Sequence, residues 1–318
     1  MSTVADPVVV RTLQVTYGGP PVVDDVSFSV ARGEMFGLIG PDGAGKTTTL
    51  RTICGLLKPA GGEVRVLGAD PYRNRAAATR TMGYLSQHFS LYGDLSVDEN
   101  IEFFARLHGV DAIGPKRTRL LGLVGLDRFR QRLADRLSGG MKQKLALACT
   151  LIHEPPVIVL DEPTTGVDPV SRREFWKLLG EFLAGGLTIV VATPYLDEAE
   201  RCGRVVLMSS GRVLALEAPA QLRRSFSGVL FEVVTPRVRD ARDVLARTLG
   251  ETQVESFGAR LHVRGEREED AARVGAILEA AGHPGASVRR IVPSLEDVFI
   301  ERLVSARPGP PTGKDVGR

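Results

Sequence analysis

The amino-acid sequence predicts an α/β fold. We expect a mixed-sheet core with an N-terminal antiparallel β subdomain and a helical subdomain, followed by a small C-terminal α+β domain. A largely apolar run at residues 34–39 leads directly into a glycine-rich segment and then a helix, as in an α/β unit. A second run, Val157–Leu160, is apolar at every position, which is typical of a central parallel strand. Beyond residue 226 the pattern follows the order βαββαβ, which predicts a small split-βαβ sandwich.

Composition narrows the class of protein. Of the 318 residues, 43% are apolar and 25% charged, which is ordinary for a soluble globular protein. A formal net charge of +3 is too weak to favour a nucleic-acid surface. Basic residues are frequent between Lys116 and Arg136, but acidic residues and leucines interrupt them, which indicates a solvated helical face. We therefore expect no nucleic-acid partner.

Cysteine usage and the chain start bear on location. Cys54, Cys149 and Cys202 show no metal or disulfide spacing, which favours a reducing compartment. No apolar run approaches the roughly 20 residues needed to cross a bilayer. The segment Met1–Asp6 has neither the basic start nor the apolar core of a secretion signal. We expect a cytoplasmic chain that reaches the membrane only through a partner.

The order of elements predicts a large N-terminal domain, a smaller second domain and a C-terminal tail. Strand patterns at 8–17, 26–30, 63–68 and 82–87 give way to helical patterns from about 88 to 153, with a capping box at Ser96–Glu99. After the strand 157–160 come, in order, a helix 170–184, a strand 187–192, a helix 196–201, two strands 204–208 and 212–216, and a helix near Ala220. These predict one domain over 7–225 with a helical subdomain at about 88–153.

The C-terminal part predicts a second, smaller domain over 226–304. The expected elements are strand 229–234, helix 239–249, strands 252–257 and 260–264, helix 268–282, strand 286–292 and a last helix to about Leu303. Residues 305–318 are rich in proline and glycine with little to bury, so a disordered tail is expected there.

A phosphate-binding pattern, G-x-x-x-x-G-K-[ST], lies between a predicted strand and a predicted helix. It comprises Gly40, Pro41, Asp42, Gly43, Ala44, Gly45, Lys46 and Thr47, and Thr48 follows on the helix. The glycines allow successive N–H groups to converge on one anion, at the positive end of the helix dipole. Lys46 adds a charge for the β- and γ-phosphates, and the Thr47 hydroxyl can ligate Mg²⁺. Since both flanks fit, we favour a nucleoside-triphosphate site over a simple strand–helix turn.

Two further motifs carry chemistry. Asp161 and Glu162 follow the strand Val157–Leu160, where Asp161 can hold Mg²⁺ opposite Thr47 and Glu162 can accept a proton from, or orient, an attacking water. The alternative is an acidic pair that caps the next turn. In the segment Leu137–Gln143, Ser138 is an N-cap before Gly139 and Gly140. This makes a second helix N-terminus that can bind an anion. On its own that segment is a simple cap, but it can also complete the nucleotide pocket of another copy.

Taken together, these motifs resemble the nucleotide-binding subunit of ATP-binding-cassette (ABC) transporters, over about residues 7–222. The resemblance rests on the phosphate loop 40–47, Gln87 after a strand, Leu137–Gly140, and the run Leu160–Pro169. It implies a P-loop NTPase fold and a head-to-tail dimer with two ATP molecules at the interface. Each ATP is then held by one subunit's phosphate loop and the other's Ser138–Gly140 segment.

The same resemblance implies roles for individual residues. Tyr17 stacks on adenine, Gln87 senses Mg²⁺ and the attacking water, Glu162 is the catalytic base, and Asp168 makes a cross-dimer contact. The helical subdomain docks on coupling helices of a transmembrane subunit. The second ATP-binding subunit can be identical or different.

Two positions depart from the family pattern. Met141 stands where many members have glutamine, and we expect little harm because the glycines are kept. Pro194 stands where the family usually has a histidine bonded to the γ-phosphate, and proline has neither a side-chain donor nor a backbone N–H. We expect hydrolysis to persist through Glu162 but to be slow. The alternatives are that a subgroup of exporters manages without the histidine, or that this copy pairs with a different ATPase subunit that holds the active site.

The C-terminal segment Pro293–Ile300 and the acidic segment Leu196–Cys202 resemble the drug- and antibiotic-export branch. We therefore expect an ATPase that uses ATP and Mg²⁺ to export a small molecule or lipid-like substrate through a separate permease, at the cytoplasmic face of the membrane. The alternative is a soluble ABC-type ATPase acting on nucleic acid or ribosomes, although such proteins usually carry two cassettes, coiled-coil inserts or basic arms. A P-loop kinase or GTPase switch is disfavoured by the Ser-Gly-Gly and Leu-Asp-Glu-Pro segments. The cargo depends on the membrane subunit.

Overall fold

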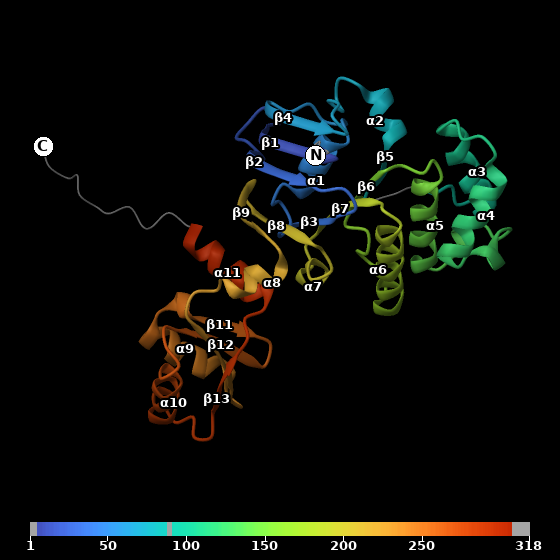
Figure 1. Ribbon diagram of the computed structural model, residues 1–318. Coiled ribbons are helices and arrows are strands. Elements are labelled where there is room, and N and C mark those ends of the chain that lie inside the picture. The colour runs from blue at the N-terminus through green and yellow to red at the C-terminus, as the bar shows by residue number, and fades with distance from the viewer. Residues whose placement is uncertain (1–4, 88–90, 307–318) are drawn as a thin grey trace, which may run out of the picture. The chain divides into compact units, whose positions relative to one another are not determined.

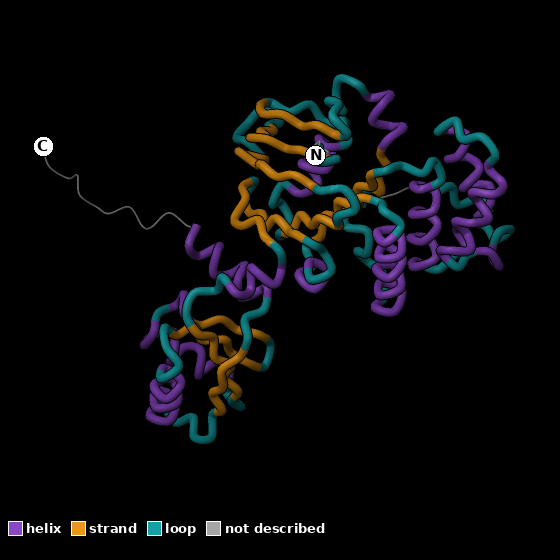
Figure 2. The backbone as a smooth tube through the Cα atoms, in the orientation of Figure 1, coloured by secondary structure: helices purple, strands orange, loops and turns teal. Residues whose placement is uncertain are grey.

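The computed structural model describes residues 5–87 and 91–306, and these residues form two compact units that meet in the sequence between Ala218 and Pro219. The ribbon and tube views show the elements of each unit (Figures 1 and 2). The boundary expected at residue 225 falls after the short helix α8 (Pro219–Arg224), which the contacts assign to the second unit. Residues 1–4 of the predicted N-terminal segment and residues 88–90 at the start of the helical subdomain lie outside the described residues.

The core of the first unit is a six-stranded sheet in the order β5-β6-β7-β3-β8-β9. Its strands are β3 (Met35–Ile39), β5 (Met82–Leu85), β6 (Val157–Asp161), β7 (Thr188–Thr193), β8 (Arg204–Ser209) and β9 (Arg212–Glu217). The first five strands in this order run parallel and β9 pairs antiparallel with β8, so the sheet is mixed. Every residue of β6 is buried, and β6 lies between β5 and β7. The predicted central parallel strand is thereby confirmed.

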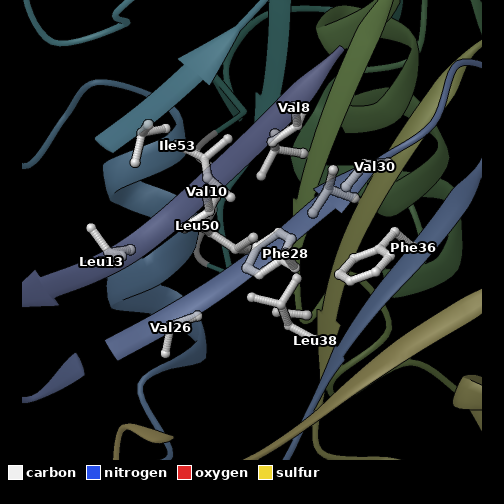
Figure 3. Packing of buried hydrophobic residues seen from close by; sticks show 14 of the residues in the cluster. Val8, Val10, Leu13, Val26, Phe28, Val30, Phe36, Leu38, Leu50 and Ile53 are labelled. Atoms are coloured by element: carbon white, nitrogen blue, oxygen red, sulfur yellow. The ribbon is translucent and has the colours of Figure 1, made fainter. Parts of the chain in front are cut away.

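A second, three-stranded antiparallel sheet has the order β2-β1-β4. Its strands are β1 (Val8–Val15), β2 (Val23–Val30) and β4 (Gly61–Val66). Apolar side chains of β1 and β2 pack against helix α1 (Lys46–Ile53) and strand β3 (Figure 3). Phe28 and Phe36 stack with ring centroids 5.0 Å apart. Burying each such side chain contributes roughly 1.5–3 kcal/mol, so this cluster fixes α1 and the loop before it.

The remaining elements of the first unit are helices. They are α2 (Arg75–Thr81), α3 (Val97–Leu107), α4 (Ile113–Val124), the short 3₁₀ helices Asp127–Phe129 and Ala134–Arg136, α5 (Gly139–Leu151), α6 (Pro169–Ala184) and α7 (Leu196–Ala199). The predicted capping box is present, since Ser96 accepts from the Glu99 N–H and Glu99 from the Ser96 N–H. Helix α2 was not predicted, because its short polar and alanine-rich sequence has no apolar stripe. It begins where Asn74 accepts from the Ala77 N–H.

The second unit has the predicted order βαββαβ followed by a helix. Its further elements are β10 (Val229–Val234), α9 (Val238–Leu249), the 3₁₀ helix Glu251–Gln253, β11 (Val254–Phe257), β12 (Arg260–Gly265), α10 (Asp270–Ala280), β13 (Ser287–Ile291) and α11 (Leu295–Ala306). The sheet is antiparallel in the order β11-β12-β10-β13, and α9 and α10 pack on one face around Phe231, Leu245 and Leu278.

The predicted tail begins too early. Residues 305 and 306 are the last residues of α11, and residues 307–318 lie outside the described part of the chain. Within the described residues, none of the helices combines the length and the apolar character that a bilayer span requires.

Candidate active site

The segment from Gly40 to Gly45 joins β3 to α1 and has a backbone that only glycine accommodates at three points. A Cβ atom at Gly40 would lie 2.3 Å from the Met208 carbonyl oxygen. Gly43 and Gly45 have φ angles of 79° and 96°, in the left-handed region. Helix α1 begins with no side-chain cap, so its first N–H groups are left for another acceptor. The result is a backbone cradle suited to phosphate.

Lys46, the first residue of α1, folds back over this cradle. Its side chain is only 4% exposed. Its Nζ donates to the carbonyl oxygens of Gly40, at 2.8 Å, and Pro41, at 3.1 Å. The same Nζ lies 3.5 Å from Oε1 of Glu162. The positively charged ammonium group of Lys46 thus lies between the glycine loop and the acidic residue Glu162 that follows β6.

Thr47 and Asp161 meet across the site. The Thr47 hydroxyl donates to Oδ1 of Asp161 at 3.0 Å, and the Tyr84 hydroxyl donates to Oδ2 at 3.3 Å. Asp161 is 1% exposed. Burial, with the negative charge of Glu162, raises the pKa of Asp161, although the hydrogen bonds from Thr47 and Tyr84 oppose that shift. An added cation would relieve this cost of burying the charge.

Glu162 is surrounded by groups that donate to it. The Gln87 side-chain amide donates to its Oε2 at 3.0 Å, and the Thr165 hydroxyl donates to the same oxygen at 3.3 Å. Glu162 itself has a φ of 49°, a left-handed conformation that is strained for a residue with a side chain. Its N–H donates to the Ala192 carbonyl at 2.9 Å, which holds this conformation in place.

A cavity of about 440 Å³ opens beside these residues. Its lining comprises Val22, Asp42, Gly43, Ala44, Gly45, Lys46, Thr47, Thr48, Gln87, Glu162, Thr165, Pro194 and Tyr195. Tyr17 follows the end of β1, is 60% exposed and has its hydroxyl 3.5 Å from that of Thr48. It is therefore next to the lining but not part of it.

The Ser138–Gly140 segment and Asp168 lie together, away from this lining. Ser138 caps α5 by accepting from the Met141 N–H, at 3.3 Å, and Asp168 caps α6 by accepting from the Val170 and Ser171 N–H groups. A Cβ atom at Gly140 would lie 2.3 Å from the Ser171 hydroxyl oxygen, so the two helix starts touch. Ser138, Gly139 and Asp168 are exposed and Gly140 is buried. A hydrogen bond donated by Ser171 lowers the pKa of the Asp168 carboxyl.

Sequence reasoning missed Tyr84, Thr165 and Tyr195. Tyr84 lies in a predicted strand, where a tyrosine is too common to indicate a bond to Asp161. Thr165 lies in the run after Glu162, three positions on. Tyr195 follows Pro194, and nothing in its local pattern distinguishes it from a surface tyrosine.

A strand, a glycine cradle with an inward lysine, and an acidic pair at the end of another parallel strand of the same sheet define a nucleoside triphosphatase of the P-loop class. Sequence comparison narrows this class. Residues 23–165 match the model of the ABC transporter family. The probable multidrug ABC transporter ATP-binding protein YbhF of Escherichia coli K12 is 42% identical over 293 residues, which is 90% of this chain and 50% of that protein. The Nod factor export ATP-binding protein I of Burkholderia orbicola is 37% identical over 299 residues, 92% of this chain and 96% of that protein.

Solved structures agree with this family. A structure of the ATP-binding subunit of an ABC transporter has a TM-score of 0.63 at 33% identity, over 69% of this chain and 92% of that one. The dimeric, post-hydrolysis structure of the ATP-binding cassette MJ0796 bound to ADP and Pi has a TM-score of 0.59 at 27% identity, over 66% and 98%. The chain belongs to the ABC transporter family and is an ABC ATPase cassette that binds ATP. It spans half the length of the E. coli relative.

Proposed function

We propose that this chain is the ATP-hydrolysing subunit that powers export of a small molecule or lipid-like substrate through a separate transmembrane permease. It would act at the cytoplasmic face of the membrane, held there by the permease. The names of the E. coli and Burkholderia relatives, a multidrug transporter component and a Nod factor exporter component, support export. The observation that carries the proposal is that Ser138 and Gly139 are exposed and lie outside the cavity formed by their own chain's phosphate loop.

An exposed anion-binding helix start needs a ligand from elsewhere, and a second copy supplies one. In a head-to-tail dimer, the Ser138–Gly140 tip of one subunit closes the phosphate loop of the other, with ATP between them. Asp168 lies beside that tip and is exposed, which suits a contact across the same interface. Tyr17 is exposed next to Thr48, which suits stacking of its ring on adenine.

The donor set at the end of β6 fits Mg²⁺. A hydroxyl (Thr47), a carboxylate (Asp161) and a nearby amide (Gln87) are the oxygen ligands that this ion prefers, together with phosphate. Burial raises the pKa of the Asp161 carboxyl, and a bound cation would favour its charged form. When bound, the ion would neutralise charge that develops on the phosphates.

Glu162 is the group we assign to proton transfer. Oε2 is held by Gln87 and Thr165, and Oε1 faces Lys46, so the carboxylate is fixed at the cavity wall. There it accepts a proton from a water that attacks the γ-phosphate. Gln87, which touches Glu162 directly, would couple the state of the nucleotide to the helical subdomain.

The permease would dock on the helical subdomain. A cavity of about 190 Å³ lies between the turn after α1 and the elements α2, β5, α3 and α5, and it is lined mainly by apolar side chains, including Leu56, Met82, Phe104 and Leu107. Leu107 is 67% exposed, and Tyr92 and Phe103 are also exposed nearby on the α3 side. An apolar groove with an exposed rim suits a short helix of a partner protein.

A mixing experiment tests the composite pocket. Lys46→Ala disables the phosphate loop and Ser138→Arg disables the helix tip, so each purified full-length variant should be inactive alone. A mixed dimer contains one intact pocket, and a 1:1 mixture should recover roughly a quarter of wild-type ATP turnover. Activity no greater than the sum of the two inactive samples would show that no pocket is shared between copies.

A further inference from the structure

A single buried carboxylate, that of Glu198 on α7, accepts four side-chain hydrogen bonds. Glu198 is 1% exposed. Its donors are the hydroxyls of Thr164 and Thr193 (the latter at 2.5 Å), the indole N–H of Trp176 at 3.0 Å and Nε of Arg172 at 2.7 Å. Three of these bonds end on Oε1 and the one from Thr193 ends on Oε2, so both carboxylate oxygens are engaged. The guanidinium of Arg172 balances its charge.

These donors come from three segments that border the active site. Thr164 is in the loop that begins at Glu162 and ends at Asp168. Thr193 is the last residue of β7 and precedes Pro194 in the cavity wall. Arg172 and Trp176 lie on α6, the helix that Asp168 caps. One side chain therefore joins the loop of the acidic pair, the wall of the cavity and the helix at the proposed dimer contact.

The residues on both sides of Pro194 are linked to this carboxylate, whereas Pro194 itself has no hydrogen-bond donor. The neighbouring Tyr195 is held in two ways. Its N–H donates to the Thr193 hydroxyl oxygen at 3.1 Å, and its ring lies 4.4 Å from the Arg172 guanidinium carbon. Both Thr193 and Arg172 are in turn bonded to Glu198. The Glu198 carboxylate therefore links the Pro194–Tyr195 wall to the 162–168 loop.

We infer that Glu198 is a positioning residue for ATP hydrolysis, which holds the loop of Glu162 and the Pro194–Tyr195 wall in register. Hydrogen bonds to a charged acceptor are stronger than those between neutral groups, so these four bonds restrict the movement of the three segments that they join. Small errors in the placement of a catalytic group lower the rate of the chemical step more than the affinity for substrate. The inference rests on the proposed role of Glu162, but it is tested without changing that residue.

The test compares Thr193→Val with Thr193→Ser in the full-length protein. Valine has a similar shape but lacks the hydroxyl, whereas serine keeps it. We expect Thr193→Val to lower kcat about tenfold with KM for ATP within about twofold of wild type, and Thr193→Ser to restore most of the rate. Glu198→Gln should also lower kcat. Glu181→Gln, at an exposed carboxylate of α6, should not.

Trp176 gives an independent readout, because it is the chain's one tryptophan and its indole bonds to Glu198. Its fluorescence emission should shift in Glu198→Gln. An unchanged emission would contradict the hydrogen bond between Trp176 and Glu198. A Thr193→Val enzyme with wild-type kcat, or one whose lost rate is matched by lost ATP affinity, would overturn the positioning role. If Glu198→Gln does not fold, the valine and serine pair still decides. If Glu162→Gln does not stop hydrolysis, Glu162 is not the catalytic base. The comparison of Thr193→Val with Thr193→Ser is unaffected by that result.

Discussion

The Gln87 side-chain amide donates a hydrogen bond of 3.0 Å to Oε2 of Glu162, although 75 positions separate them. The contact exists because β5 and β6 are adjacent and parallel, with Leu85 opposite Leu160. Their carboxyl ends therefore reach the same edge of the sheet, where open α/β sheets bind ligands. A substitution or movement of either residue therefore changes the hydrogen bonding of the other.

Replacing Glu162 with glutamine should stop hydrolysis while ATP still binds. Glutamine keeps the shape but cannot accept a proton, so phosphate release should fall by about 100-fold or more. ATP-bound dimers should then accumulate, as measured by size-exclusion chromatography with light scattering. Glu174→Gln is a matched control, because Glu174 is an exposed carboxylate on α6 that pairs with Lys144. Unchanged phosphate release in the Glu162 variant would remove it from the role of base.

Replacing Pro194 with histidine should speed hydrolysis. Pro194 lines the cavity and offers no donor, whereas an imidazole there can stabilise charge on the γ-phosphate. We expect turnover to rise by roughly tenfold in steady-state phosphate-release assays. Pro194→Ala removes the ring without adding a donor and should not reproduce the gain. If Pro194→His has wild-type turnover, the proline does not explain slow hydrolysis.

Replacing Gly40 with alanine should destabilise the fold. The added Cβ would lie 2.3 Å from the Met208 backbone oxygen, which has little room to move. The free energy of unfolding in urea, without nucleotide, should fall by about 1–3 kcal/mol. Gly180 lies inside α6 with open space beside it, so Gly180→Ala should instead stabilise by about 0.5–1 kcal/mol. Equal stability of the two variants would contradict the close approach at Gly40.

Acid should destabilise the first unit through His153. Burial, together with the charge of the stacked His108 ring, lowers the pKa of His153 from 6.5 to about 4. The unfolded chain therefore takes up a proton that the folded chain resists, and stability is lost as pH falls from 6.5 towards 4. The loss should be on the order of 2 kcal/mol.

His153→Phe keeps a ring against His108 but cannot be protonated. Urea unfolding at pH 8, 6.5 and 5 should show a shallower loss for this variant than for wild type. At pH 8, where neither protein is protonated at this position, the variant should be less stable, because it loses the contact with the Met82 carbonyl. The same pH slope in both proteins would rule out His153 as the source.

A charge at Leu107 should disrupt docking of the permease. Leu107 lines the apolar groove and is exposed, so an aspartate there would put a charge into a partner's apolar surface. Co-purification with the permease from detergent-solubilised membranes should fall by about tenfold or more, with unchanged ATP binding. Leu123→Asp, at a 41% exposed leucine of α4 outside the groove, is the control. Equal co-purification of the two variants would place the interface elsewhere.

Much of the site could be predicted from local sequence. The glycines, Lys46 and Thr47 form a contiguous pattern whose backbone requirements are written in the residue types themselves. The run before Asp161 is apolar throughout, so its burial follows from composition. The cap at Ser138 follows from residues three positions apart.

Contacts between distant segments could not be predicted in that way. Helix α2 carries no apolar stripe, so its existence depends on its surroundings rather than its period. The bond from Tyr84 to Asp161 joins residues on neighbouring strands, and a tyrosine in a strand is too common to signal it.

The sequence by itself determined the class of fold, the phosphate cradle and the acidic pair, because each is specified by residues adjacent along the chain. Only the tertiary structure decided that Glu198 collects donors from three segments, and that Gln87 touches Glu162. The physical reason is that hydrogen bonding depends on distance and angle in space. Those are set by how strands and helices pack, and a list of residue types does not contain them.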